Sequence, residues 1–216
     1  MTHQSVRVFG AALLIAALTL ASSAQGLSYP LSSDEIREAY YLGRSTDGAK
    51  LAKFFGNYVH KFPYPARGPY VESVELRTPY EQVVLASRTR LSNYDPVEAV
   101  KDFSSRPGIM LVLVNVYSTR DYSGPVTTTT PSGTNLWSAG DYLRDFQFRV
   151  EQKNAVKPRT IKQGSACGFG GCSPFPGFQE TLQFDADQLQ SDETTITITT
   201  PDGTELSAEF DLDTLK

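Results

Sequence analysis

Residues 109–117 constrain the fold of this chain more than any other segment. Both alternating faces of this run are apolar, and β-branched residues such as Ile109, Val112 and Val114 are frequent in it. A strand with two apolar faces is stable only where other layers cover both faces. The sequence therefore predicts a central strand here, with further structure packed on each side.

The residues before this run have the periodicity of helices. Ser32, followed by Asp34 and Glu35, predicts a helix start, because a serine cap and early acids suit the free N–H groups and the dipole there. Residues 47–61 predict a second helix. It has the clearest amphipathic stripe in the chain, formed by Leu51, Phe54, Phe55, Tyr58, Val59 and Phe62.

Two later helices are predicted to begin with a capping residue followed by proline. Residues 78–81 read Thr-Pro-Tyr-Glu, in which the glutamate can also reach back to the first amide. Residues 95–98 have the same arrangement of a capping residue, a proline and a glutamate, and they start a shorter helix that ends before residues 106–108. Between these regions, the prolines of residues 62–69 exclude a helix, and residues 70–77 form a candidate strand.

The residues after the central run favour β-structure. Residues 118–140, which contain Trp137, have the composition of one long surface loop. The last two strand-like runs flank Pro-Asp-Gly at residues 201–203, which predicts a hairpin. Strand patterns occur at residues 146–150, 159–162, 180–185, 194–200 and 204–212.

Helices followed by strands predict an α+β fold, with a helical N-terminal half and a C-terminal half that forms an antiparallel β-sheet or β-sandwich. Residues 25–107 are the mainly helical region and residues 108–216 the β-rich region. The sequence leaves open whether the two regions form one domain or two.

Residues 1–24 have the organisation of a cleavable signal peptide. A polar stretch with Arg7 precedes the apolar residues 11–21, and Ser-Ser-Ala follows at residues 22–24. The apolar run is about half the roughly 20 residues that a membrane-spanning helix needs. We therefore expect Sec-type export to the periplasm or the exterior, and the absence of an Asn-x-Ser/Thr site favours a bacterial source.

The charge distribution argues against two classes of partner. The formal net charge is −4, and the chain contains no run of basic residues. Nucleic-acid binding needs a patch that neutralises phosphates, and binding to an anionic membrane surface needs basic side chains. Neither class is expected as a partner, and no membrane span is expected in the mature chain.

Cys167 and Cys172 are the two cysteines of the chain, and they enclose the sequence Gly-Phe-Gly-Gly. In an oxidising compartment such a pair predicts a structural disulfide, and the glycines supply the backbone freedom that a small ring needs. A redox-active dithiol normally has two intervening residues, and a zinc site would need two further ligands. We therefore predict a disulfide, with no metal site and no cofactor.

Catalytic chemistry has few candidates in this chain. His60 is the only histidine after residue 24, and we expect it at the end of the second helix, where an imidazolium meets the negative end of the dipole. The sequence contains no Gly-x-Ser-x-Gly motif of serine hydrolases, no His-Glu-x-x-His motif of zinc proteases, and no phosphate-binding loop or Gly-x-Gly-x-x-Gly motif of nucleotide-binding proteins. A pair of carboxylates could still hydrolyse a glycosidic bond, and the candidates in the β-rich half are Asp141, Asp145, Glu180 and Asp185.

Aromatic residues outside the predicted core offer a binding hypothesis, because exposed rings stack on sugars or peptides. Trp137, in the long loop, is the strongest candidate for a ligand contact. The other rings that fall near turns or off the apolar faces are Tyr41, Tyr64, Tyr70 and Tyr122.

These observations favour an exported, non-catalytic binding or structural module whose partner is an envelope or extracellular protein or a glycan. The alternative is an exported hydrolase of wall polymer or peptide that uses carboxylates or His60. A third hypothesis is a module that pairs with a partner strand at the edge of the hairpin at residues 194–212, which would require an uncovered edge.

Overall fold

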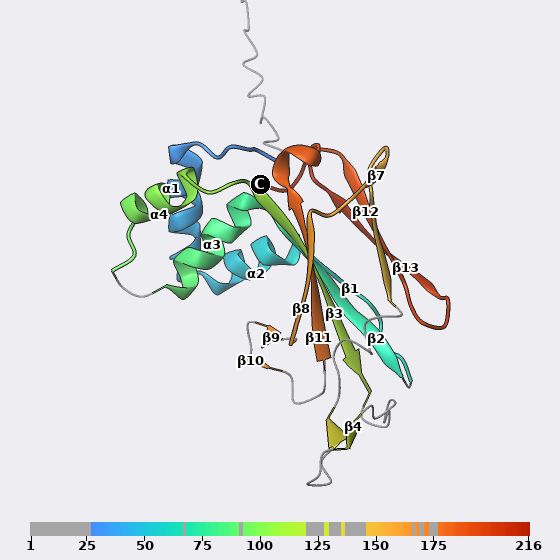
Figure 1. The fold of residues 1–216 in the computed structure, drawn as a ribbon. Coiled ribbons are helices and arrows are strands. Elements are labelled where there is room, and N and C mark those ends of the chain that lie inside the picture. Colours follow the sequence, from blue (N-terminus) through green and yellow to red (C-terminus); the bar gives the residue numbers. More distant parts are fainter. Residues whose placement is uncertain are drawn as a thin grey trace, which may run out of the picture.

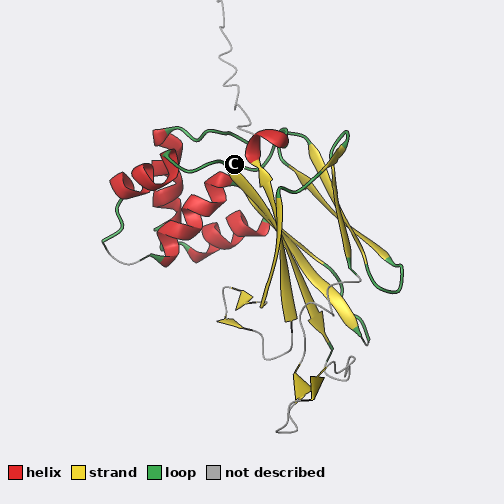
Figure 2. Ribbon diagram, in the orientation of Figure 1, coloured by secondary structure: helices red, strands yellow, loops and turns green. Residues whose placement is uncertain are grey.

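A computed structural model describes residues 27–66, 68–90, 93–119, 128–129, 135–136, 146–165, 167–168, 171–172 and 177–216. A group of helices lies to one side of two antiparallel sheets (Figures 1 and 2). The predicted α+β class is confirmed, because the helices fall between residues 33 and 104 and most strands follow them. The predicted signal peptide, residues 1–24, lies outside the described residues and stays a prediction.

The helices are α1 (Ser33–Gly43), α2 (Gly48–Gly56), α3 (Pro79–Thr89) and α4 (Pro96–Ser104). Ser32 and Glu35 form a complete capping box on α1, because each side chain bonds the backbone N–H of the other residue. Thr78 and Asp95 cap α3 and α4, each before a proline, as the sequence predicts.

The second helix is shorter than predicted, and His60 does not lie on it. Helix α2 ends at Gly56, and the chain then enters strand β1 (Val59–Lys61), which contains His60. Gly56 and Asn57 are weak helix formers, and a neighbouring strand supplies partners to the backbone from Tyr58 onward. The expected role of His60 at a helix C-terminus was therefore wrong.

Strand β3 (Ile109–Ser118) lies in the centre of a five-stranded antiparallel sheet, as predicted. The order of this first sheet is β1, β2 (Pro69–Arg77), β3, β11 (Gly177–Asp185) and β8 (Thr160–Ser165). Strands β1 and β2 come from the mainly helical region, so this sheet contains strands from both halves of the chain.

The second sheet contains the predicted C-terminal hairpin. Its order is β13 (Glu205–Asp211), β12 (Glu193–Thr199), β6 (Gln147–Glu151) and β7 (Ala155–Val156). The two sheets pack on one apolar core that combines every second residue of the facing strands. Among its members are Met110, Val112, Val114, Val150, Leu182, Phe184, Ile196, Ile198 and Phe210.

Two short strand pairs complete the described part. Strand β4 (Thr128–Thr129) pairs with β5 (Asn135–Leu136) inside the segment that was predicted as one long loop. Trp137 follows β5 and lies outside the described residues. Strand β9 (Cys167–Gly168) pairs with β10 (Gly171–Cys172), and a 3-10 turn, η1 (Ala186–Gln188), follows β11.

Lys216 connects the helices to the first sheet. Its carbonyl oxygen accepts hydrogen bonds from the hydroxyls of Tyr58, which precedes β1, and Thr78, the cap of α3. Its ammonium lies 2.8 Å from a carboxylate oxygen of Glu38 on α1 and sits over the ring of Tyr80 on α3. Residues distant in the sequence thus meet at one junction.

No helix of the described part is both long and apolar enough to cross a bilayer.

Helices α1 and α3 are in close contact at Gly43. A Cβ at this position would lie 2.3 Å from the backbone oxygen of Val84 and 2.9 Å from the Cβ of Ser87. Because a backbone atom cannot move aside as a side-chain tip can, only glycine permits this helix contact. Ile36, Ala39 and Tyr40 are buried on the same face of α1.

Gly43→Ala should therefore destabilise the protein by about 2 kcal/mol or more, although alanine is the better helix former. The measurement is the free energy of unfolding in urea. The control is Gly56→Ala, because no atom lies within 4 Å of its Cβ. That variant should gain up to about 1 kcal/mol. Equal effects of the two substitutions would contradict the close contact.

Candidate functional site

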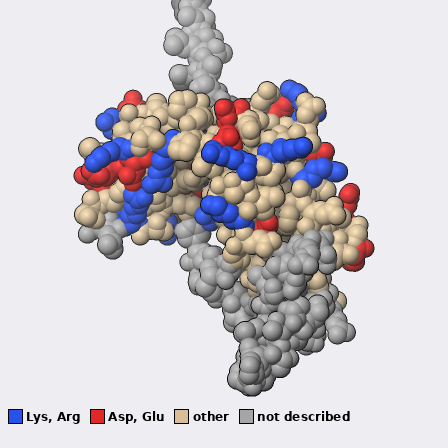
Figure 3. All heavy atoms as spheres, viewed as in Figure 1, with Lys and Arg blue, Asp and Glu red and all other residues tan. Residues whose placement is uncertain are grey.

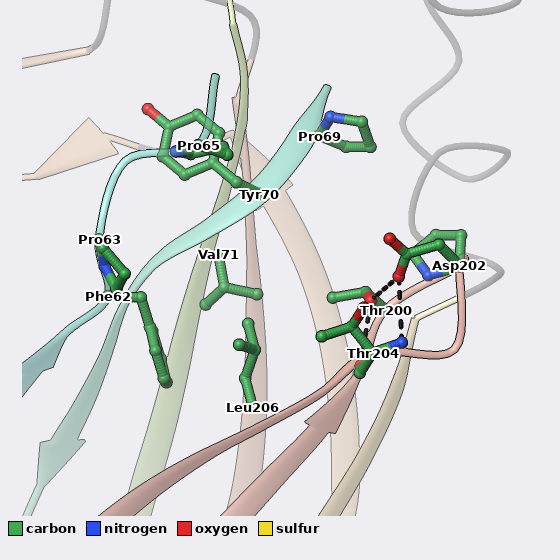
Figure 4. A pocket seen from close by; sticks show the side chains of 11 residues that line it. Phe62, Pro63, Pro65, Pro69, Tyr70, Val71, Thr200, Asp202, Thr204 and Leu206 are labelled. Carbon is green, nitrogen blue, oxygen red and sulfur yellow. Dashed lines mark hydrogen bonds between the residues drawn. The ribbon is translucent and has the colours of Figure 1, made fainter. Parts of the chain in front are cut away.

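A cavity of about 480 Å³ lies between the β1–β2 connection and the β12–β13 turn. We call it the mouth cavity (Figure 4). Its described lining residues are Phe62, Pro63, Pro65, Pro69, Tyr70, Val71, Thr200, Pro201, Asp202, Thr204 and Leu206. This volume is within the roughly 300–1,000 Å³ of typical ligand pockets.

The first wall of the mouth cavity is an extended segment that proline and glycine hold in place. Phe62 donates its N–H to the carbonyl of Glu72 at 2.9 Å, and the prolines that follow fix their own φ angles. Gly68, with a φ of 109°, donates to the hydroxyl of Thr119 at 3.0 Å and accepts from its N–H at 3.1 Å. The described residues of this wall are largely apolar.

The second wall is the hairpin turn, and it is polar. Thr200 and Thr204 close the turn through a backbone hydrogen bond of 2.9 Å, and Gly203 takes a φ of 85°. Asp202 accepts hydrogen bonds from the Thr200 hydroxyl and from the N–H of Thr204. These bonds lower the pKa of the Asp202 carboxyl, which therefore stays ionised at neutral pH.

The two walls give the mouth cavity a mixed chemistry. Phe62, Val71 and Leu206 project toward its interior, whereas Asp202 and its threonine partners lie together on the turn (Figure 4). The described lining residues include one carboxylate and no basic side chain. The cavity therefore suits a ligand with an apolar body beside a hydrogen-bond donor or a positive charge.

Two of the rings proposed as ligand contacts lie at this site. Tyr70 lines the mouth cavity, and the 66% exposed Tyr64 packs edge-on against it with ring centres 4.9 Å apart. Tyr41 is also exposed but lies on α1, where it packs on Tyr40. Trp137 and Tyr122 lie outside the described residues, so the contact proposed for Trp137 stays a prediction.

His60 lies near the mouth cavity but does not line it. Its ring packs on Phe62, with ring centres 4.8 Å apart. Within the described part, His60 makes no hydrogen bond to a hydroxyl or a carboxylate. No nucleophile–base pair forms around it there.

The carboxylates proposed for glycosidic hydrolysis do not converge among the described residues. Glu180 and Asp185 lie five positions apart on β11, so their side chains point to opposite faces of the sheet. Glu180 is buried beside Val114, whereas Asp185 pairs with Arg159 at 3.0 Å. The other two candidates, Asp141 and Asp145, lie outside the described residues.

Glu81 on α3 is a buried carboxyl that the sequence did not single out as unusual. It is 0% exposed, and neither side-chain oxygen has a hydrogen-bond partner. Burial raises its pKa to about 8; Arg77 opposes this shift and Glu75 adds to it. The predicted capping bond from this carboxylate does not form, although the Thr78 hydroxyl accepts from the Glu81 N–H as expected.

The two cysteines occupy opposing positions on neighbouring strands. Cys167 and Cys172 are direct partners in the antiparallel β9–β10 pair. Directly opposed residues in such a pair have Cα atoms about 4.5–5.5 Å apart, within the range that a disulfide spans. The backbone register is therefore compatible with the predicted disulfide, which stays a prediction.

The described residues form no metal centre. No group of three or more His, Cys, Asp or Glu residues there could hold a metal ion. On the face shown in Figure 3, basic and acidic side chains are interspersed over the helices and the sheets.

No protein-family model matches the chain, and comparison with curated proteins gives no significant match.

The pKa of Glu81 predicts a pH-dependent stability. Between its ordinary value of 4.5 and about 8, the folded protein keeps a proton that the unfolded chain releases, so stability falls as pH rises through this window. Glu81→Gln does not titrate, so its stability relative to the parent should increase across the window by at most about 4 kcal/mol.

This difference is measured by urea unfolding of both proteins from about pH 5 to about pH 9. Glu98→Gln is the control, because it makes the same substitution at an exposed position on α4. If the parent and Glu81→Gln lose stability in parallel across the window, Glu81 is already ionised in the folded protein.

The cysteine pair predicts a protein without free thiols. Cys167 and Cys172 should resist alkylation until a reductant is added, and the mass should then rise by two alkyl groups. Cys167→Ala combined with Cys172→Ala should cost about 2 kcal/mol, because the ring is small. Immediate alkylation of the unreduced protein would contradict the disulfide.

Proposed function

We propose that this protein is a non-catalytic binding module of the cell envelope or exterior, and that it holds its ligand in the mouth cavity. The observation that supports the proposal is the cavity itself, which two segments about 140 positions apart in the chain form together. A cavity that is already present in the folded protein favours binding, because little conformational entropy is lost when the ligand enters.

The ligand that fits best is a peptide segment of another protein, with an apolar side chain next to a lysine or arginine. Phe62 and Leu206 offer apolar contact, and the ionised Asp202 offers a partner for the positive charge. A sugar ring has hydroxyls around its rim and needs several polar partners. The polar side chains here are few, and Thr200 and Asp202 already bond each other.

The hydrolase remains the alternative, with a substrate of wall polymer or peptide. Two observations favour the binding module over it: the contact of His60 with a phenylalanine ring, and the opposite orientations of Glu180 and Asp185. Hydrolysis of wall polymer or peptide that is lost in His60→Ala would establish the hydrolase instead.

The binding proposal is tested by selecting ligands from a random peptide library and then changing the cavity. Selected peptides should share an apolar residue beside a basic one. Leu206→Lys places a bulky cation in the cavity and should weaken their binding by at least about tenfold. Asp202→Asn keeps the acceptor oxygen of the turn but removes the charge, so it should weaken basic peptides selectively.

Ser207→Lys is the matched control, because it adds the same side chain one residue along β13, where the side chain is exposed. It should leave binding unchanged. Peptides that bind Leu206→Lys as well as they bind the parent would contradict the site. Binding of wall oligosaccharides that Leu206→Lys abolishes would keep the site but replace the ligand class.

A further inference from the structure

Each sheet ends in an edge strand whose outer side has no partner strand in the described part of the chain. Strand β8 is an edge of the first sheet, and β13 is an edge of the second (Figure 1). Residues 161–164 of β8 are all exposed, and Ile161 retains 54% of its surface. An open edge presents free N–H and C=O groups that can pair with another strand.

The two edges carry opposite charges. Strand β8 and the residues just before it contain Lys157, Arg159 and Lys162, of which Arg159 pairs with Asp185. Strand β13 carries exposed acids at Glu205, Glu209 and Asp211. Like charges placed directly opposite each other destabilise a strand pair, so two β13 edges or two β8 edges repel. The charges favour contact between a β8 edge and a β13 edge.

We propose that the protein self-associates by strand addition, with β13 of one copy pairing antiparallel with β8 of the next. This inference does not depend on the mouth cavity. Opposite charges on the edges of one chain identify a second copy as a complementary partner, since each copy supplies both edges.

In one antiparallel register, the core-facing side chains of β8 and of β13 fall on the same face of the joined sheet. With Lys162 opposite Glu209, Ile161 lies opposite Phe210 and Thr160 opposite Asp211. Ile161 pairs with Leu182 of β11, so it is on the face that packs against the second sheet. Phe210 also points into the core between the sheets. Apolar side chains thus continue on one face of the joined sheet, and charged side chains continue on the other.

The contact is heterologous, because one copy uses β8 and the other uses β13. Each added copy leaves one free edge of each kind, so the association produces open chains of copies rather than a closed two-fold dimer. The charges involved are solvent-exposed, so salt should weaken the assembly.

The test is sedimentation velocity of the purified protein over a series of concentrations, at low and at high salt. The parent should show a concentration-dependent increase in size that high salt reduces. Lys162→Glu and Glu209→Lys should each weaken association by at least about tenfold. The double variant restores an opposite-charge pair and should associate nearly as well as the parent.

Lys50→Glu is the matched control, because it reverses an exposed charge on helix α2, which belongs to neither edge strand, and should leave association unchanged. Ile161→Asn is a second variant that removes the apolar contact without changing the charge, and it should also weaken association. Circular dichroism of each variant should match that of the parent, since these side chains are exposed.

A parent that stays monomeric at every concentration would overturn the proposal and leave the edges to strands of another protein. Association that Lys162→Glu does not change would also overturn it, because β8 would then not take part. The same holds if the double variant associates no better than the single variants.

Discussion

The architecture depends on β3, because one face of this strand lies in the core between the sheets and a neighbouring strand pairs with each of its edges. Met110, Val112 and Val114 enter the core between the sheets, while β2 and β11 pair along nearly the whole length of β3. This strand therefore fixes the register of its two neighbours and positions the face on which the second sheet packs. The β1–β2 connection belongs to the first sheet and the β12–β13 turn to the second, so the mouth cavity exists only because the two sheets share this core.

The helices are joined to this sandwich by a few specific contacts. The side chain of Phe54 packs against both the helical core and the core between the sheets. Lys216 adds polar contacts to Tyr58, Thr78 and Glu38, which belong to different elements. Glu81 on α3 destabilises the fold as it ionises, because a charge without a hydrogen-bond partner is costly in an apolar interior.

The features that the sequence predicted correctly are those that depend on neighbouring residues. The caps of α1, α3 and α4, the two-sided apolar run of β3 and the Pro-Asp-Gly turn are all local patterns, and the structure has each of them. The prediction of the second helix was wrong beyond Gly56. There the pairing of Val59 with Glu75, on a strand later in the sequence, outweighed the helical pattern of apolar residues. The mouth cavity was not predictable for the same reason, since Leu206 and Phe62 meet only after both sheets form. The prolines of residues 62–69 and the turn at residues 201–203 can be recognised in the sequence, but no local sequence pattern shows that these two segments face each other.

Strand β13 takes part in both proposals, because its alternate side chains face the mouth cavity and the solvent. Leu206 points into the mouth cavity, whereas Glu209 points outward from the same strand. In the proposed register, a neighbouring copy would run along β13 as far as the residues that form the cavity wall. A ligand in the cavity and a neighbour on the edge would then contact the same strand, so each would change the free energy with which the other binds. Such coupling is reciprocal, so the ligand would change the affinity of assembly by the same factor by which assembly changes the affinity for the ligand.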